Sequence, residues 1–204
     1  MEILNNIKEK TFIFNGDVYN YFYHEYNSTS INERCVEIPI IWKIVCLYEG
    51  KNILEIGNTL SNYFDINYDV VDKYEKGKSC VINQDIVDFC PSKMYDLIVS
   101  ISTFEHIGYD EQQKEEDKPL RAIEKVKSML SPGGKACITI PLGYNFALDR
   151  MILTRKMKFS NVYFLNRLLS DTNSWTQVKQ QDLHIEYKKP YDYIYWLAIC
   201  IIDN

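Results

Sequence analysis

Apolar runs and helical stripes alternate along the chain from residue 51 to residue 140. The apolar runs have the length of strands, and the segment 118–130 carries its apolar side chains on a single helical face. Near-continuous apolar strands that alternate with helices are typical of a parallel sheet covered on both faces. The expected strands are 52–56, 68–71, 80–82, 95–101 and 135–140.

The segments on either side of this core have different patterns. Residues 1–50 contain an aromatic and polar stretch and a helical stripe at 37–48, so we expect an N-terminal helical cap or lid rather than a domain. Beyond the fifth strand we expect a helix over 148–156 and a mobile or helical stretch near 163–169.

The C-terminal residues predict a pair of antiparallel strands. Segments 183–188 and 194–202 lie on either side of Lys189-Pro-Tyr-Asp192, which is a hairpin-like arrangement at one sheet edge. The whole chain therefore predicts one compact α/β unit, with 51–204 as its main domain. We expect a Rossmann-like sheet of about seven strands, mostly parallel with an antiparallel C-terminal edge hairpin, and helices on both faces.

Composition narrows the classes of protein that fit this pattern. Of 204 residues, 46% are hydrophobic and 25% are charged, as in an ordinary globular protein. The net charge of -5 argues against nucleic acid as a partner, because phosphate binding normally needs a basic face. No Cys-x-x-Cys pair occurs among the six cysteines, and most lie in apolar runs, which fits a reducing compartment.

Targeting and membrane signals are the next consideration. The first ten residues lack the apolar core of a signal peptide, and the apolar run at 194–202 is too short to span a bilayer. We therefore expect a cytoplasmic protein with no transmembrane segment, and we leave its oligomeric state open.

Two of the expected strands end in residues suited to a nucleotide. The first ends at Glu55 and Gly57, and the second ends at Asp72. A glycine lets the backbone approach a ligand closely, and a carboxylate at the tip of the next strand can accept hydrogen bonds from ribose hydroxyls. This pattern predicts a cofactor that contains a nucleoside.

Five blocks in this order resemble the class I S-adenosylmethionine-dependent methyltransferases, over residues 52 to about 145. The blocks are Asn52-Ile-Leu-Glu-Ile-Gly57, Val70-Val-Asp72, Gln84-Asp-Ile86, Tyr95 through Ile107, and Leu130-Ser-Pro-Gly-Gly-Lys135. The resemblance implies that 51–204 is a catalytic domain that binds S-adenosyl-L-methionine. It also implies a role for each matching position: Glu55 and Gly57 at the methionine end, Asp72 on the ribose, Asp85 on the adenine amino group, Ile86 on the adenine ring, and Ser100 and Ile101 facing the amino-acid portion.

The first loop departs from the family pattern. The family usually has Gly-x-Gly-x-Gly, whereas this chain has a single glycine in Gly57-Asn-Thr-Leu-Ser61. Asn58 tolerates left-handed backbone geometry better than most residues and could take the place of a glycine. The alternative is a Rossmann-like domain for another nucleotide, or for none; NAD fits less well because Gly-x-Gly-x-x-Gly is missing.

Three stretches, 27–39, 55–61 and 140–145, resemble a narrower bacterial group of methyltransferases associated with surface-polysaccharide (capsule) modification. That resemblance implies O-methylation of a sugar hydroxyl, or of another oxygen on a phosphorylated or glycan-linked small acceptor or its nucleotide-linked precursor. Two other functions stay open. One is a noncatalytic methyltransferase-like interaction subunit, and the other is an N-methyltransferase, although the Asn-Pro-Pro-Tyr type of motif is absent.

His106 is the first candidate for a catalytic base, since it follows the fourth strand where the acceptor should approach. It is also compatible with a structural role at the start of the next helix. His24 is the second candidate, in a segment that could cover the cofactor or simply lie on the surface. Methyl transfer can also proceed by alignment alone, without a base. We expect no metal, because Glu105 and His106 would have only Ser102 as a third ligand.

Residues for the acceptor are expected around the ends of the same strands. Arg150 belongs to a basic cluster that suits a phosphate group or forms a solvated helix face. Arg34 either joins the N-terminal helix to the cofactor site or simply pairs with Glu37. The remaining candidates are Tyr144 and Asn145 at the pocket mouth, and Tyr23, which could stack on a sugar ring or pack in the core.

Overall fold

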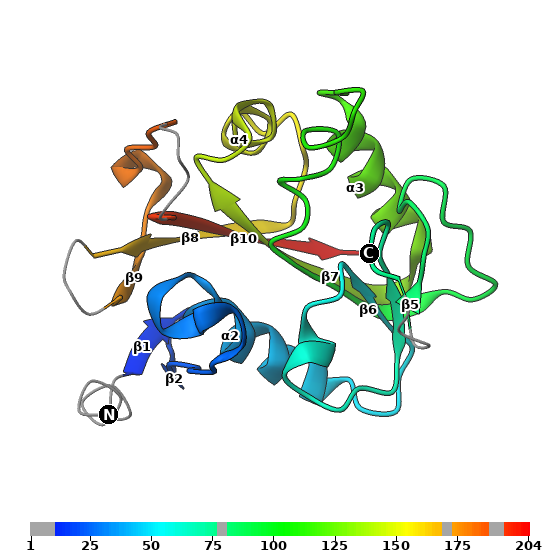
Figure 1. Cartoon of the computed structure of the whole chain (residues 1–204), viewed down its shortest axis with the longest axis horizontal. Coiled ribbons are helices and arrows are strands. Elements are labelled where there is room, and N and C mark those ends of the chain that lie inside the picture. The colour runs from blue at the N-terminus through cyan, green and yellow to red at the C-terminus, as the bar shows by residue number, and fades with distance from the viewer. Residues whose placement is uncertain (1–10, 77–80, 169–172, 188–193) are drawn as a thin grey trace.

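The computed structural model describes residues 11–76, 81–168, 173–187 and 194–204. A sheet of eight strands crosses the molecule, with α3 (Lys118–Met129) and α4 (Phe146–Leu153) on one side and α2 (Arg34–Leu47) on the other (Figure 1). In spatial order the strands are β5 (Val81–Ile82), β4 (Asp69–Val71), β3 (Ile53–Ile56), β6 (Tyr95–Ile101), β7 (Leu130–Leu142), β10 (Trp196–Asp203), β8 (Asn161–Arg167) and β9 (Trp175–Val178).

The sheet has a parallel half and an antiparallel half. Strands β5, β4, β3, β6 and β7 are parallel neighbours, whereas β10 runs antiparallel to both β7 and β8. Strand β9 is antiparallel to β8 and closes the sheet. Ile56 pairs with Val71 on one side and with Ser100 on the other, so the carboxyl ends of β3, β4 and β6 lie side by side.

The central strands are apolar because both of their faces are covered. Along β6, Leu97 and Val99 pack in the core on the α2 side, whereas Ile98 packs in the core beneath α3 and α4. Successive side chains of a strand point to opposite faces, so a strand with a helix layer on each side needs apolar residues at nearly every position. The expected α/β fold is confirmed, and the strands predicted from 52 to 140 are all present.

Two predictions for the C-terminal third are wrong. The stretch near 163–169, predicted to be mobile or helical, contains most of β8, where the neighbouring residues Phe164 and Leu165 are both buried. The segment 194–202 does form a strand, β10, but it lies inside the sheet between β7 and β8. Residues 183–187 form no strand beside it, and Lys188 lies outside the described residues.

The N-terminal segment is not purely helical. Helix α2 confirms the predicted helix, but β1 (Thr11–Phe14) and β2 (Asp17–Asn20) form an antiparallel hairpin before it. The turn between them consists of Asn15 and Gly16, both at positive φ, 51° and 85°. Asn-Gly between two such runs favours a two-residue hairpin turn, a signal that the sequence interpretation missed. Residues 1–10 lie outside the described part of the chain.

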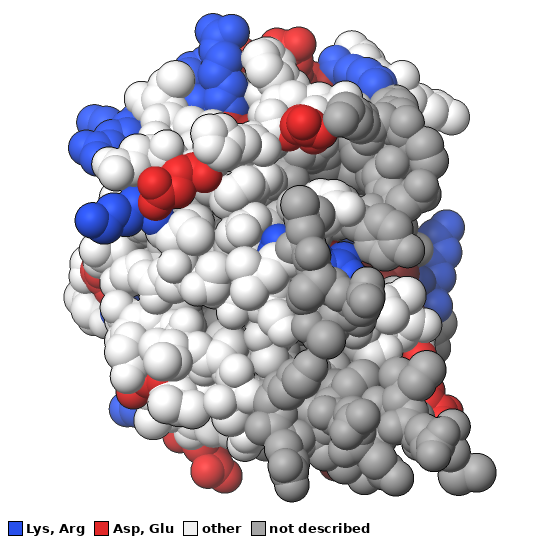
Figure 2. Space-filling model, turned by 90° about the vertical axis from the view of Figure 1, so that its left-hand side faces the viewer, with Lys and Arg blue, Asp and Glu red and all other residues white. Residues whose placement is uncertain are grey.

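Three short 3-10 segments complete the described elements, at Tyr26–Ile31, Leu60–Asn62 and Gln180–Asp182. Within the described residues, no helix is long and apolar enough to cross a membrane. Figure 2 shows the end of the molecule where β9 and the hairpin lie. On the described part of this face, Lys and Arg side chains lie beside Asp and Glu and do not form the continuous basic surface that polyanions require.

Candidate active site

A cavity of about 400 Å³ opens at the carboxyl ends of β3, β4 and β6, and we call it the strand-tip cavity. Ligands of open α/β sheets bind at this position. Loops from four parts of the chain line the cavity: 57–59 after β3, 72–74 after β4, 84–86, and the segment 102–111 after β6. Of the residues predicted from sequence, it brings together Gly57, Asn58, Asp72, Asp85, Ile86 and His106.

Glu55, Ser100 and Ile101 are fully buried and do not line this cavity. Glu55 Oε1 accepts hydrogen bonds from the backbone N–H groups of Thr59 (2.7 Å) and Leu60 (2.8 Å), which shapes the loop after β3. Burial raises the pKa of Glu55 to about 7 despite these hydrogen bonds. Ser100 Oγ donates to the carbonyl of Ile56 at 2.8 Å. In this structure these side chains support the loops instead of facing the cavity.

Asp72 and Asn58 are connected across the cavity wall. Asp72 Oδ2 accepts from the Asn58 N–H at 3.2 Å, and Oδ1 accepts from the N–H groups of Tyr74 (2.8 Å) and Glu75 (2.7 Å). Oδ2 therefore keeps capacity for a further donor. The Nδ2 atom of Asn58 is buried and has no hydrogen-bond partner. A buried donor without a partner is costly, so this amide is a polar group that the described residues leave unsatisfied beside the cavity.

Asn58 does not adopt the left-handed backbone that its sequence position allowed. Gly57 has the positive φ of this loop, 83°, and Ser102 on the facing loop has a φ of 40°. Thr103 packs directly over Gly57, and its Oγ1 donates to the carbonyl of Ile101 at 3.1 Å. Position 57 therefore requires glycine because the Thr103 side chain approaches it closely, whereas the sequence had suggested a close approach by the ligand.

Four charged side chains form a ring of ion pairs at the β4–β5 side of the cavity. Lys118 Nζ lies 2.7 Å from Asp85 Oδ2 and 2.6 Å from Glu111 Oε2, and Lys73 Nζ lies 2.9 Å and 2.6 Å from the same two atoms. Burial alone would raise the pKa values of Asp85 and Glu111, but the hydrogen bonds from Lys118 and Lys73 outweigh it and hold both below their ordinary values. Both carboxylates are thus held in the ionised form.

The charge of the strand-tip cavity is acidic overall. Its described lining includes four carboxylates and one lysine. A sulfonium or ammonium group is favoured by such a surface, because opposite charges attract most strongly where water is partly excluded. The lining carboxylates are Asp72, Asp85, Asp110 and Glu111.

His106 shares a carboxylate with Tyr144. Its Nδ1 atom is 2.5 Å from Asp110 Oδ2, and the Tyr144 hydroxyl donates to the same oxygen at 2.7 Å. The His106 and Tyr144 rings meet edge to face with centroids 4.9 Å apart. An Nδ1–H that donates to Asp110 leaves the Nε2 lone pair available, which is the arrangement that a histidine base needs.

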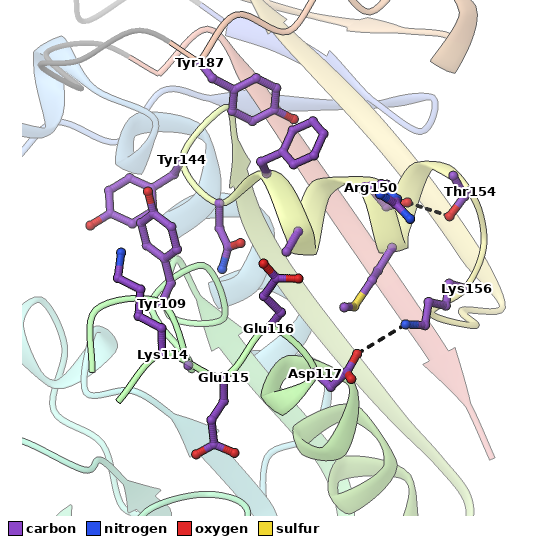
Figure 3. A pocket seen from close by; sticks show the side chains of 15 residues that line it. Tyr109, Lys114, Glu115, Glu116, Asp117, Tyr144, Arg150, Thr154, Lys156 and Tyr187 are labelled. Atoms are coloured by element: carbon purple, nitrogen blue, oxygen red, sulfur yellow. Dashed lines mark hydrogen bonds and ion pairs between the residues drawn. The ribbon is translucent and has the colours of Figure 1, made fainter. Parts of the chain in front are cut away.

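A second cavity, of about 770 Å³, lies between α4 and the segment 108–117, and we call it the α4 cavity (Figure 3). Tyr144, Asn145 and Arg150 all line it, and none of the three is among the lining residues of the strand-tip cavity. Asn145 has both side-chain groups occupied: Oδ1 accepts from the Leu148 N–H at 3.2 Å and Nδ2 donates to the Glu105 carbonyl at 3.1 Å. In this structure Asn145 therefore caps α4 and joins it to the segment after β6.

The N-terminal candidates line neither of the two cavities. His24 is exposed, and its Nδ1 accepts from the Tyr26 N–H at 3.0 Å. The hydroxyl of Tyr23 is buried without a hydrogen-bond partner. Arg34 forms an ion pair with the fully buried Glu37. None of His24, Tyr23 and Arg34 lines the strand-tip or the α4 cavity as described.

Besides its ion pair with Arg34, Glu37 accepts hydrogen bonds from two residues at the ends of sheet strands. Its Oε1 atom accepts from Ser102 Oγ at 2.7 Å and from Thr139 Oγ1 at 2.6 Å. The N-terminal helix is thereby joined to the ends of β6 and β7. The sequence left two alternatives for Arg34: an ion pair with Glu37, or a connection between the N-terminal helix and the cofactor site. Both apply in part, because Arg34 pairs with Glu37, and Glu37 connects α2 to the ends of β6 and β7.

Several site residues were missed from sequence. Asp110 lies four positions after His106, a spacing that brings side chains together on one helical turn and could have been noticed. Lys118 lies four positions before Ala122 and eight before Val126, on the buried stripe of α3. Its burial was therefore readable from periodicity. Within the described residues, no group of three or more His, Cys, Asp and Glu is arranged to hold a metal ion.

Comparison with known proteins supports the fold. No protein-family model and no curated protein matches the chain. Among solved structures, it is similar to the N-methyltransferase NodS from Bradyrhizobium japonicum WM9 in complex with S-adenosyl-L-homocysteine, with 14% identity, a TM-score of 0.50, and coverage of 85% of this chain and 88% of NodS. This likeness confirms the expected Rossmann-like methyltransferase fold.

Two further structures are more distant. The plantazolicin methyltransferase BpumL shares 15% identity over 81% of each chain, with a TM-score of 0.45. The sugar N-methyltransferase KedS8 from Streptoalloteichus sp ATCC 53650 shares 14% identity over 62% of this chain and 57% of its own, with a TM-score of 0.38.

Proposed function

We propose that the chain is an S-adenosylmethionine-dependent methyltransferase that acts on a small polar acceptor. The observation that carries this proposal is the strand-tip cavity, which Asp72, Asp85 and Asn58 line together. Its acidic lining suits a cofactor with a cationic sulfonium. Its position at the tips of β3, β4 and β6 suits a nucleoside.

The residues of the cavity fit the parts of this cofactor one by one. Asp72 Oδ2 has capacity left for a ribose hydroxyl, and Ile86 offers an apolar surface for the purine. Asp85 Oδ1 accepts from the Val87 N–H at 3.2 Å and has a second lone pair that can accept the purine amino group. Asn58 lines the same cavity, and we assign its side chain to the polar amino-acid portion. When bound, the cofactor supplies an electrophilic methyl carbon.

The residues around His106 provide the remaining chemistry. Asp110 fixes the imidazole through Nδ1 and leaves Nε2 to take the proton that an acceptor hydroxyl loses. The His106 side chain is 45% exposed, so an acceptor can reach it. Alignment of the acceptor with the methyl carbon supplies the larger share of the acceleration, because methyl transfer from a sulfonium is intrinsically favourable.

The α4 cavity is the proposed site for the body of the acceptor. Its charged residues balance, with Lys114, Arg150 and Lys156 against Glu115, Glu116 and Asp117. It also presents four aromatic rings, from Tyr109, Tyr144, Phe146 and Tyr187 (Figure 3). A balanced polar cavity with aromatic walls suits a hydroxyl-rich ring. We therefore propose O-methylation of a sugar, phosphorylated or glycan-linked acceptor, as in surface-polysaccharide biosynthesis.

A second candidate is N-methylation. NodS, whose fold the chain shares, is an N-methyltransferase. The carboxyl group of Glu105 is buried beside His106, 3.5 Å from Nε2, and its Oε2 has no hydrogen-bond partner. Burial raises the pKa of Glu105 well above its ordinary value and favours its neutral form, so the feature that suits an amine acceptor is the acidic lining of the strand-tip cavity.

One experiment separates these functions. The protein is incubated with cofactor carrying a labelled methyl group and with matched panels of sugars, sugar phosphates and amino sugars, and products are identified by mass. Label on oxygen supports the first candidate, and label on nitrogen supports the second. Saturable cofactor binding with no transfer to any acceptor would favour a noncatalytic subunit and contradict both.

A further inference from the structure

Lys118 is a buried cation at the first turn of α3. Its side chain is 5% exposed, and its ammonium group donates to Asp85 Oδ2 (2.7 Å), Glu111 Oε1 (2.7 Å) and Glu111 Oε2 (2.6 Å). All three N–H donors of the ammonium are therefore used. Burying a lysine is costly unless it is paired in this way, so its position on the apolar stripe of α3 needs an explanation.

The two carboxylates that Lys118 joins belong to different parts of the site. Asp85 lies in the loop after β5, on the nucleoside side of the strand-tip cavity. Glu111 lies in the segment after β6, one residue beyond Asp110, which orients His106. Glu111 Oε1 also accepts from the Gly108 N–H at 3.1 Å, so the carboxylate fixes the turn of that segment. Lys118 thus forms a bridge between the two sides of the cavity.

We propose that Lys118 is a positioning residue that sets the specificity of the site for a 6-aminopurine nucleoside, by fixing the Asp85 carboxylate toward the purine amino group. The proposal rests on the proposed function, because it takes the nucleoside to be that of the methyl donor. Lys118 binds Oδ2, while Oδ1 accepts from the Val87 N–H, its one donor among the described residues. That oxygen accepts an amino group but repels the carbonyl oxygen of a 6-oxopurine.

Because Lys118 also binds Glu111, it connects Asp85 to the segment after β6. Asp85 cannot shift without moving the ammonium group that also holds Glu111, so nucleoside recognition and the conformation of the segment 106–111 are joined mechanically. Lys73 contacts the same two carboxylates but is 35% exposed, and its flexible, hydrated ammonium fixes their position less strictly.

The test compares two ligands by isothermal titration, S-adenosyl-L-homocysteine and its 6-oxo analogue S-inosyl-L-homocysteine. The wild-type protein is expected to prefer the 6-amino ligand strongly. Lys118→Met is expected to lower the ratio of the two affinities by about tenfold or more, since a charge-assisted hydrogen bond that orients the acceptor is lost. Lys118→Arg keeps the cation and is expected to retain most of the preference. Thermal unfolding establishes that each variant is folded.

The matched control is Lys127→Met in the same helix. Lys127 is partly exposed and pairs with Glu124 at 2.8 Å, so its loss should leave the affinity ratio unchanged. If Lys118→Met does not fold, Lys118→Gln, which keeps a donor without a charge, provides the same comparison.

Two results would overturn the assignment of Lys118. One is a folded Lys118→Met or Lys118→Gln protein with the wild-type affinity ratio. The other is a Lys118→Arg protein with a ratio as low as that of the Met variant, which would show that packing and not charge is responsible. A wild-type protein that binds neither ligand would instead reject the proposed function itself.

Discussion

Thr103 lies so close over Gly57 that a Cβ atom added at Gly57 would be 2.1 Å from Thr103 Oγ1. This contact explains why position 57 in the loop after β3 requires glycine. Gly57 also has a φ of 83°, a conformation that L side chains rarely adopt. The glycine therefore serves two needs at once, a left-handed backbone and room for the side chain that forms the facing wall of the cavity.

Replacing Gly57 by alanine should disturb both the loop and the cavity. The strained φ and the clash with Thr103 together are expected to cost about 2–4 kcal/mol of stability and to weaken cofactor binding. Differential scanning fluorimetry and calorimetric titration measure the two effects. Gly50→Ala is the control, because Gly50 has a similar φ of 76° but a Cβ added there would meet no atom within 4 Å. Equal losses in the two variants would show that the contact with Thr103 has no cost.

Asp110→Asn tests the orientation of His106. The amide can no longer accept a charge-assisted hydrogen bond from Nδ1–H, so the imidazole loses its fixed tautomer and position. We expect turnover to fall by about tenfold or more while affinity for S-adenosyl-L-homocysteine changes much less. Asp17→Asn, in an exposed pair with Lys43, is the control. Unchanged turnover in Asp110→Asn would remove His106 from the proposed base role.

Asp149 gives the protein a predicted pH dependence of stability. Its carboxyl group is fully buried on α4, where Oδ2 accepts from the Gly143 N–H (2.7 Å) and the Tyr187 hydroxyl (2.9 Å) and Oδ1 has no partner. Burial raises the pKa of Asp149 from 3.8 to about 7, against the effect of these two hydrogen bonds. The folded protein therefore binds this proton more tightly than the unfolded chain does.

The sign of the effect follows by linkage. A carboxyl group with a raised folded-state pKa stabilises the fold below pH 3.8, and this stability is lost as the pH rises toward about 7. Asp149→Asn has no proton to lose, so its stability relative to the wild type should improve between pH 5 and pH 8. Urea unfolding of both proteins across this range measures the difference. A constant difference would contradict the assignment.

The sequence allowed the parallel half of the fold to be predicted because its signals are local. Apolar runs of strand length, a turn glycine and terminal acids lie within a few residues of each other, as at 52–57 and 70–72. The order of the last strands depends on contacts between distant segments. Strand β10 pairs with β7 more than fifty residues earlier, so nothing near 194–202 identifies its neighbours.

Part of the candidate site could also be predicted from the sequence, namely the residues at the strand ends. Asp72, Asp85 and His106 lie in motif blocks at strand ends, and the structure brings them to one cavity. The bridge through Lys118 and Glu111 could not be derived from spacing, because it joins side chains from α3 and two loops. The same holds for Thr103 over Gly57, which depends on how closely β3 and β6 are paired.

Calorimetric titration of S-adenosyl-L-homocysteine into the wild-type protein and an Asp72→Asn variant tests the central claim most directly. We predict saturable binding of one ligand per chain by the wild type, and an affinity about tenfold or more lower for the isosteric variant, because a neutral amide is a weaker acceptor for ribose hydroxyls. The absence of saturable binding at millimolar ligand, or equal affinity in both proteins, would contradict it.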